Sequence, residues 1–148
     1  MQTRRALLTA AAFVPLTAAL PAFGQKRVFA AKIKLLGPRV TIDVMVNGKG
    51  PYPFMIDTGG YLSLMEEGLI AELGLTRIGQ IGMRGVGGSQ ISRLFRASDV
   101  IFGGGVRQRD VVFAAMSGGF GAGIRGVLAA GMLTQFDSEL DFDRGEWR

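Results

Sequence analysis

The stretch FMIDTGGYLSL, residues 54–64, places a lone carboxylate at the end of an apolar run. Residues 54–56 have the pattern of a buried strand, and Asp57 follows them directly, before Thr58-Gly59-Gly60. An unpaired carboxylate beside such a strand is unfavourable unless it is hydrogen-bonded or has a function. Asp57 is therefore the first candidate for a functional residue, and an aspartate that caps a turn is the alternative interpretation.

The composition excludes several classes of active site. The chain has 148 residues and contains neither histidine nor cysteine. A Ser-His or Cys-His nucleophile pair, an imidazole general base and a thiolate zinc site therefore cannot be built. Any chemistry must rest on carboxylates, hydroxyls, lysine or arginine. The length predicts one domain with a modest hydrophobic core.

The first 24 residues have the pattern of an export signal. Arg4 and Arg5 precede an apolar run over residues 6–22, and Ala22-Phe23-Gly24 places small residues at a cleavage site. We expect cleavage after Gly24 and a periplasmic or extracellular mature protein. The Thr3–Leu8 start resembles a twin-arginine signal, and an ordinary secretory signal is the alternative.

The mature chain, residues 25–148, is moderately basic. Of the 17 basic and 12 acidic side chains in the whole sequence, 15 and 12 remain after removal of the signal. Basic residues cluster ahead of the first acid, Asp43, but no stacking aromatics or binding motif accompany them, so we expect no nucleic-acid partner. Pro15 and Pro21 interrupt the apolar run, so we expect no stable membrane anchor after processing.

The mature sequence has the pattern of short strands separated by glycine-rich turns. Residues 40–46 alternate between apolar and polar side chains, and Asn47-Gly48 is a strong hairpin signal. We expect Tyr52–Ile56 to form the returning strand. Because residues 47–53 include two glycines and two prolines, we expect a loop longer than a two-residue turn.

One short helix is predicted after the aspartate. Ser63 and Glu66 have the spacing of a capping box, and apolar residues recur at roughly helical spacing as far as Gly74. We therefore expect a helix over residues 64–73 that stops at Gly74.

Two further glycine clusters divide the remaining strands. Residues 77–84 and 90–96 flank Gly85-Val86-Gly87-Gly88, and residues 100–102 and 106–115 flank a run of three glycines. The first cluster lacks the lysine and the following helix of a phosphate-binding loop, so we interpret it as a hairpin tip. Many short strands with glycine-rich turns and one helix predict an all-β barrel or sandwich.

The chemistry available to Asp57 depends on a second carboxylate. A single carboxylate is a poor general base at neutral pH. Two carboxylates about 3 Å apart cannot both ionise, so they share a proton, and the pair can activate water while it protonates a carbonyl. A catalytic role for Asp57 therefore requires a second copy of this residue.

Taken together, these motifs resemble the retropepsin-like aspartic peptidases. Met55–Gly59 matches their apolar-apolar-Asp-Thr-Gly motif, and Arg84–Gly88 matches the glycine-rich flap that closes over substrate. Val127-Leu128-Ala129, followed by Met132-Leu133, matches a late apolar-apolar-Gly element that leads into a short helix. Leu140–Gly145 resembles the terminal strand of exported bacterial members. The resemblance covers nearly all of the mature chain.

The resemblance implies a small closed acid-protease-like barrel with one short helix after the Asp-Thr-Gly loop and a glycine-rich flap hairpin. It implies hydrolysis of a peptide or protein substrate by activated water, without a cofactor, a metal or a covalent intermediate. A homodimer or a second homologous lobe would complete the site, and Thr58 would hydrogen-bond across it. The implied site residues are catalytic Asp57, Thr58 and Gly59; substrate-binding Gly60, Gly85, Val86, Gly87 and Gly88; and loop-supporting Val127, Leu128 and Ala129.

Three positions depart from the family's pattern. Ala129 stands where the family has glycine, Gly60 replaces the usual alanine or serine, and Arg125 stands where bacterial members often have an acid. These departures motivate an alternative, a catalytically inactive barrel that binds peptides or partner strands. A third hypothesis is the first lobe of a longer two-lobed peptidase, because the sequence stops after Glu146–Arg148, where a return strand would begin.

The end of the chain carries a second group of carboxylates. Asp137, Glu139, Asp141 and Asp143 alternate along one predicted strand face, as metal ligands can. No loop geometry for Ca²⁺ accompanies them, so we favour a solvated strand face. Trp147 is interpreted as an interface or core residue.

Overall fold

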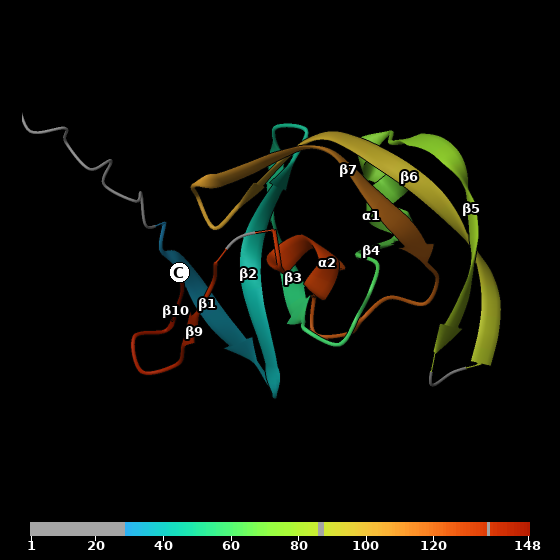
Figure 1. The fold of residues 1–148 in the computed structure, drawn as a ribbon. Coiled ribbons are helices and arrows are strands. Elements are labelled where there is room, and N and C mark those ends of the chain that lie inside the picture. The colour runs from blue at the N-terminus through green and yellow to red at the C-terminus, as the bar shows by residue number, and fades with distance from the viewer. Residues whose placement is uncertain (1–28, 86–87, 136) are drawn as a thin grey trace, which may run out of the picture.

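The computed structural model describes residues 29–85, 88–135 and 137–148, so the predicted export signal lies outside the described residues. Strands dominate this part of the chain (Figure 1). No helix within these residues is long and apolar enough to span a membrane. The elements are β1 (Ala31–Leu36), β2 (Arg39–Val46), β3 (Lys49–Asp57), β4 (Leu64–Glu66), α1 (Glu67–Leu73), β5 (Thr76–Gly85), β6 (Gly88–Phe102), β7 (Val106–Met116), β8 (Gly126–Ala129), α2 (Ala130–Leu133), β9 (Leu140–Asp141) and β10 (Glu146–Trp147).

The strands form one sheet whose central part closes into a ring. The order is β5-β6-β7-β4-β8-β3-β2-β1-β10-β9, and an additional pairing joins β2 to β6. Six strands, from β6 through β7, β4, β8 and β3 to β2, are therefore linked in a circle around the core (Figure 1). The predicted all-β fold, with strands closed on themselves, is confirmed.

The β2–β3 hairpin differs in one respect from the expectation. Asn47 and Gly48 both have positive φ angles, 48° and 77°, and Val46 pairs directly with Lys49. The turn therefore has two residues, and the prediction of a longer loop over residues 47–53 was wrong. Positive φ at both turn positions matches the twist of the strands, so pairing resumes at once.

The core fixes β3 against β8. Ile42 and Phe54 are fully buried, and the Phe54 ring lies edge-on to Phe113, with ring centroids 6.0 Å apart. Phe54 also lies directly opposite Gly126 in the parallel β3–β8 pair. A Cβ atom at Gly126 would lie 2.6 Å from two carbons of the Phe54 ring, so this close approach requires glycine.

The predicted helix starts later than its sequence signal indicates. Residues 64–66 form β4, which pairs with β7 and β8, and α1 begins at Glu67. No side chain caps the N-terminus of α1, so the predicted capping box of Ser63 and Glu66 was wrong. Strand pairing outcompetes the local signal because the neighbouring strands satisfy this backbone. The stop at Gly74 is confirmed, with a left-handed φ of 64°.

The other glycine clusters lie at hairpin ends, as predicted. Gly85 pairs with Gly88 at the end of the β5–β6 hairpin, and Phe102 pairs with Val106 across the three-glycine turn. Near the end of the chain, β10 pairs with both β9 and β1. Trp147 of β10 is buried and belongs to the hydrophobic core, which decides between its two interpretations.

Candidate active site

Asp57 is the last residue of β3, and its carboxylate is held by the turn that follows. Its Oδ1 accepts hydrogen bonds from the backbone N–H groups of Gly59, at 2.9 Å, and Gly60, at 3.1 Å. Aspartate commonly folds a turn in this way, by accepting N–H groups two and three residues ahead. The two hydrogen bonds fix the orientation of the half-buried carboxylate.

The other side-chain polar groups of the motif, Asp57 Oδ2 and the Thr58 hydroxyl, have no hydrogen-bond partner in the described part of the chain. Thr58 and Gly59 are exposed. One oxygen of the carboxylate is thus fixed by the protein, and the other is available for water or a second carboxyl group.

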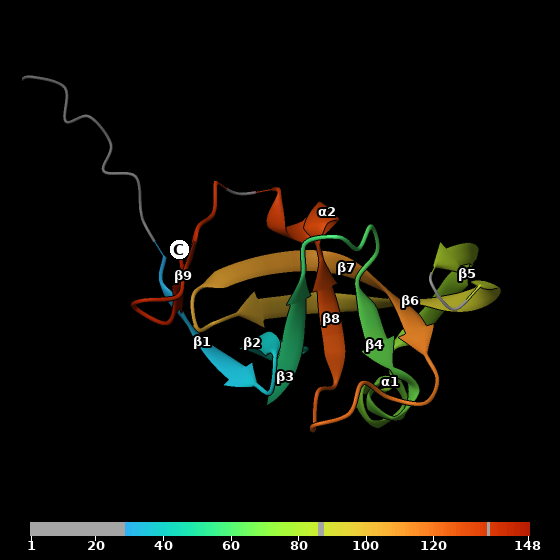
Figure 2. The ribbon, with the colours of Figure 1, turned by 90° about the horizontal axis from the view of Figure 1, so that it is seen from below.

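The turn rests on β8 and α2, which come from much later in the sequence. Asp57 and Ala129 lie opposite each other in the parallel β3–β8 pair. The Ala130 N–H donates to the Gly60 carbonyl at 3.0 Å, and the Ala129 N–H donates to Ser63 Oγ at 3.0 Å. Figure 2 shows β3, β8 and β4 side by side, with α2 at the end of β8 next to the loop after β3.

The predicted loop-supporting residues form the floor of the site. Val127, Leu128 and Ala129 are all buried, with at most 3% of each exposed. Ser63, which the sequence pattern predicted to be a helix cap, belongs to this floor. No local pattern predicts that it supports β8, because the Ala129 N–H group that donates a hydrogen bond to it is 66 residues away.

The predicted flap corresponds to the outer part of the β5–β6 hairpin. In Figure 1 the end of this hairpin and the loop after β3 lie toward the same lower side of the molecule. Gly85 and Gly88 close the described ladder, whereas Val86 and Gly87 lie outside the described residues. Ile91, on the same hairpin, is an exposed apolar side chain, with 74% of its surface accessible.

The sequence matches one family model, whose description is aspartyl protease, over residues 42–135. The chain belongs to the aspartyl protease family. The matched region contains the Asp57 turn, both strands of the β5–β6 hairpin, and β8 with α2.

Two solved structures share the fold of this chain. A retropepsin-like aspartic protease from Rickettsia conorii has 16% identity and a TM-score of 0.56, over 77% of this chain and 84% of that chain. The retroviral protease-like domain of Ddi1 from Leishmania major has 14% identity and a TM-score of 0.51, over 74% of this chain and 86% of that chain. The retropepsin-like fold is thus confirmed. No curated protein matches the sequence.

The structure shows contacts of Arg125 that the sequence did not predict. Its guanidinium bonds Glu66 through Nε at 2.6 Å and Glu72 through Nη2 at 3.2 Å, and it lies 5.7 Å from the centre of the Tyr52 ring. Arg125 precedes β8, whereas Ala129 and Asp57 lie at the other end of the strand pair. This departure from the family pattern therefore tethers α1 and β4 to β8, away from the carboxylate.

The contacts in this cluster change the pKa values of Glu72 and Tyr52. A hydrogen bond of 2.8 Å from the Tyr52 hydroxyl, and then the Arg125 guanidinium, hold the pKa of Glu72 below its ordinary value. The hydrogen bond to Glu72 raises the pKa of Tyr52. No local sequence pattern predicts this cluster, because Arg125 is 59 and 53 residues from its two acidic partners.

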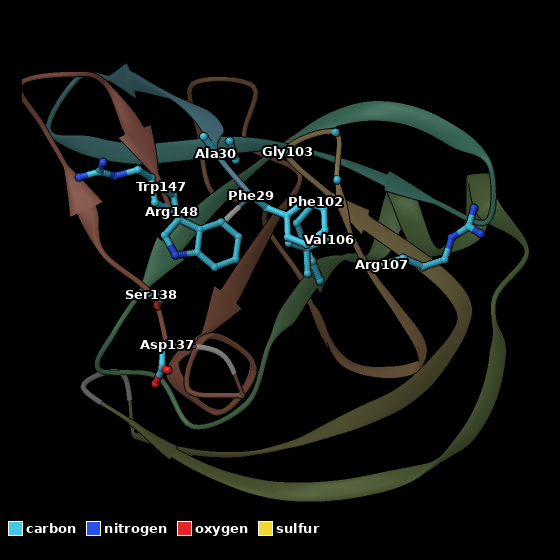
Figure 3. Close-up of a pocket in the computed structure, with 13 residues that line it drawn as sticks. Phe29, Ala30, Phe102, Gly103, Val106, Arg107, Asp137, Ser138, Trp147 and Arg148 are labelled. Atoms are coloured by element: carbon cyan, nitrogen blue, oxygen red, sulfur yellow. The ribbon is translucent and has the colours of Figure 1, made fainter. Parts of the chain in front are cut away.

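A cavity of about 740 Å³ lies elsewhere in the protein. Phe29, Phe102 and Trp147 line it, and in Figure 3 the guanidinium groups of Arg107 and Arg148 point away from it. No predicted catalytic, flap or floor residue is among its lining residues, so it is separate from the Asp57 site.

Among the four carboxylates near the end of the chain, Glu139 and Asp141 pair with arginines. Asp141 pairs with Arg144 at 3.3 Å and with Arg148 at 3.0 Å, and Glu139 also pairs with Arg148. The Arg144 backbone N–H is the main cause of the lowered pKa of Asp141. Within the described ranges, no group of three or more acidic side chains is arranged to hold a metal ion.

Proposed function

We propose that this protein is an aspartic endopeptidase whose catalytic pair consists of two Asp57 carboxylates, one from each chain of a homodimer. The observation that carries the proposal is the state of the carboxylate: two backbone N–H groups fix Oδ1, and the described residues leave Oδ2 without a hydrogen bond. Membership of the aspartyl protease family supports the same conclusion.

The pair would work through a shared proton. When two carboxyl groups lie about 3 Å apart, one is ionised and the other is protonated. The ionised group takes a proton from a water molecule, which attacks the scissile carbonyl carbon, while the protonated group donates to the carbonyl oxygen. The tetrahedral intermediate then collapses, and the leaving nitrogen takes up a proton. No covalent bond to the protein forms in this sequence.

The dimer is part of the proposal because each chain supplies one Asp-Thr-Gly turn. A second copy would bring its own Asp57 opposite the first and give the exposed Thr58 hydroxyl a hydrogen-bond partner. Peptide would lie across Gly59 and Gly60, where no side chain obstructs the backbone, beneath the β5–β6 hairpin.

The first test compares the chain from Gln25 onward with its Asp57→Asn variant in cleavage of a mixed peptide library at acid and neutral pH. We expect the variant to lose at least about a hundredfold in kcat/KM, because a dimer of variant chains lacks both carboxyl groups of the acid-base pair. Asp110→Asn is the matched control, since Asp110 is exposed and its φ of 54° suits asparagine as well as aspartate. Equal turnover by the Asp57→Asn variant would contradict the proposal.

A mixing experiment tests the shared site. At constant total protein, excess Asp57→Asn chain should capture wild-type chains in mixed dimers that have one aspartate. Activity should then fall as the square of the wild-type fraction. A linear fall would show that each chain carries a complete site.

The alternative is a barrel that binds peptides without cleaving them. It is favoured because each chain has one Asp-Thr-Gly motif and therefore only one carboxylate of the catalytic pair. It predicts saturable peptide binding with no cleavage at any pH and at any protein concentration. If the protein is one lobe of a two-lobed enzyme, cleavage should appear only after a homologous lobe is added.

The proposal also includes export of the protein from the cytoplasm. The arginine pair and apolar run of residues 1–24 support secretion, with processing after Gly24. Recovery of a form that begins at Gln25 from the periplasm or the medium would agree with this, and an uncleaved cytoplasmic form would contradict it.

A further inference from the structure

Gly60 lies against both the Asp57 carboxylate and the methyl group of Ala129. A Cβ atom at position 60 would lie 2.9 Å from Oδ2 and 3.3 Å from Cγ of Asp57, and 3.5 Å from the Ala129 Cβ. The first distance is shorter than nonbonded contacts of real Cβ atoms, whereas the third is an ordinary van der Waals contact. A methyl group at position 60 would therefore press on the carboxylate, and the Ala129 methyl closes the space toward β8.

Hydrogen bonds prevent the loop from moving away to relieve this overlap. The Gly60 N–H donates to Asp57 Oδ1 at 3.1 Å, and the Gly60 carbonyl accepts the Ala130 N–H at 3.0 Å. The Ala129 N–H donates to Ser63 Oγ, and Ala129 is 1% exposed. The turn, the methyl group and the carboxylate thus form one closely packed unit.

This packing connects two positions that are far apart in the sequence. The turn has no side chain at Gly60, and β8 supplies a methyl group at Ala129, which lies opposite Asp57 in the β3–β8 pair. We propose that Ala129 is a positioning residue for Asp57: its methyl group, contributed by β8, takes the packing place beside the carboxylate, and the glycine at position 60 makes room for it.

The two positions should therefore be coupled. Gly60→Ala alone adds a methyl group where one is already present, and Ala129→Gly alone leaves a void under the turn. The double variant Gly60→Ala/Ala129→Gly moves the methyl group from one side of the contact to the other. The double variant should return the Asp57 carboxylate closer to its wild-type position than the summed effects of the two single changes predict.

The inference rests on the proposed function only in its kinetic readout, so the first measurement does not need activity. In ¹H–¹⁵N spectra, the backbone amide signals of residues 59 and 60 report the two hydrogen bonds to Asp57 Oδ1. We expect Gly60→Ala to shift the Gly59 signal strongly and the double variant to return it toward the wild-type position. Gly68→Ala is the control, because a Cβ atom there meets its nearest neighbour, Glu66 Oε1, at 3.7 Å.

The kinetic readout uses the same four proteins. We expect Gly60→Ala to lower kcat by about tenfold or more with little change in KM, because a displaced carboxylate affects the reacting atoms more than the bound peptide. The double variant should regain most of this loss. If Ala129 had a purely structural role, the variants would yield less folded protein, and the folded fraction would not show a fall in kcat at nearly constant KM.

Each outcome decides the inference. If Gly60→Ala does not fold but the double variant does, the coupling is supported. Additive effects of the two changes, an unshifted Gly59 signal in Gly60→Ala, or a double variant no better than Gly60→Ala would overturn it. If no variant and no wild-type protein hydrolyses peptide but the amide signals follow the expected pattern, the proposed function fails and the positioning pair stands.

Discussion

The Ser63 hydroxyl accepts a 3.0 Å hydrogen bond from the backbone N–H of Ala129, 66 residues later in the chain. Both residues are buried, at 4% and 1% exposure. The Ser63 carbonyl also accepts the Ala114 N–H at 3.0 Å, so this residue joins the turn after Asp57 to β7 as well as β8. One buried side chain that is not part of the Asp-Thr-Gly motif thus helps to hold the turn after Asp57 in place.

Ser63→Ala should destabilise the fold by about 1–3 kcal/mol, because the buried Ala129 N–H loses its acceptor. Thermal and urea unfolding of the variant would measure this loss. Ser98→Ala is the control, since Ser98 is exposed and should change stability by less than about 0.5 kcal/mol. If both variants lost equally little stability, the Ser63 hydrogen bond would contribute little to the free energy of unfolding.

Gly126→Ala should destabilise the core by about 1–3 kcal/mol or more. The added methyl group would overlap the ring of fully buried Phe54, which Phe113 confines from another side. Gly82→Ala is the control for the same chemical change, because no atom outside its neighbours lies within 4 Å of its Cβ position. Denaturant midpoints of the two variants would be compared, and a stable Gly126→Ala variant would mean that the ring relaxes freely.

Removal of the Arg125 guanidinium should have a pH-dependent effect. The pKa of Glu72 is lower in the folded protein, so its interactions stabilise the fold above the ordinary carboxyl pKa and are lost as pH falls through the lowered value. Arg125→Gln should therefore lower Tm by a few degrees at pH 7, and the difference should narrow below about pH 4.

Lys34→Gln is the control for this series. The Lys34–Asp43 pair is 2.7 Å long, but its side chains are 57% and 39% exposed, so its loss should change Tm little at either pH. If the difference in Tm between wild type and Arg125→Gln stayed constant from pH 7 to pH 3, the guanidinium would act through packing and not through its charge.

Thr58→Val should weaken the proposed dimer. If each Thr58 hydroxyl hydrogen-bonds across the two-fold axis, two hydrogen bonds are lost, which corresponds to a rise in dimer Kd of about tenfold to a hundredfold. Sedimentation at a series of concentrations would measure it. Thr76→Val, on exposed β5, is the control, and an equal Kd for wild type and Thr58→Val would contradict the cross-dimer role.

The sequence predicted the hairpin positions well and the helix start poorly, for one physical reason. The Asn47-Gly48 turn and the stop at Gly74 depend on backbone conformations that glycine and asparagine allow locally. The capping box at Ser63 is also a local signal, but β7 and β8 offered residues 64–66 strand partners, and Ser63 bonded Ala129 instead. At these three positions, the local signal held where no distant strand competed for the same backbone. The loop over residues 47–53 was predicted too long for a different reason, because its later glycine and prolines lie within β3.

By itself, the sequence determined which kinds of active site the chain cannot build, and it identified Asp57 as the candidate functional residue. The absence of histidine and cysteine and the position of Asp57 after an apolar strand are properties of the chain alone. The tertiary structure decided what surrounds that carboxylate: the Ser63 acceptor, the contact between Gly60 and Ala129, and the distance of the Arg125 cluster from the site. These depend on which strands lie side by side, because contacts between residues more than fifty positions apart exist only once the ring of strands has closed.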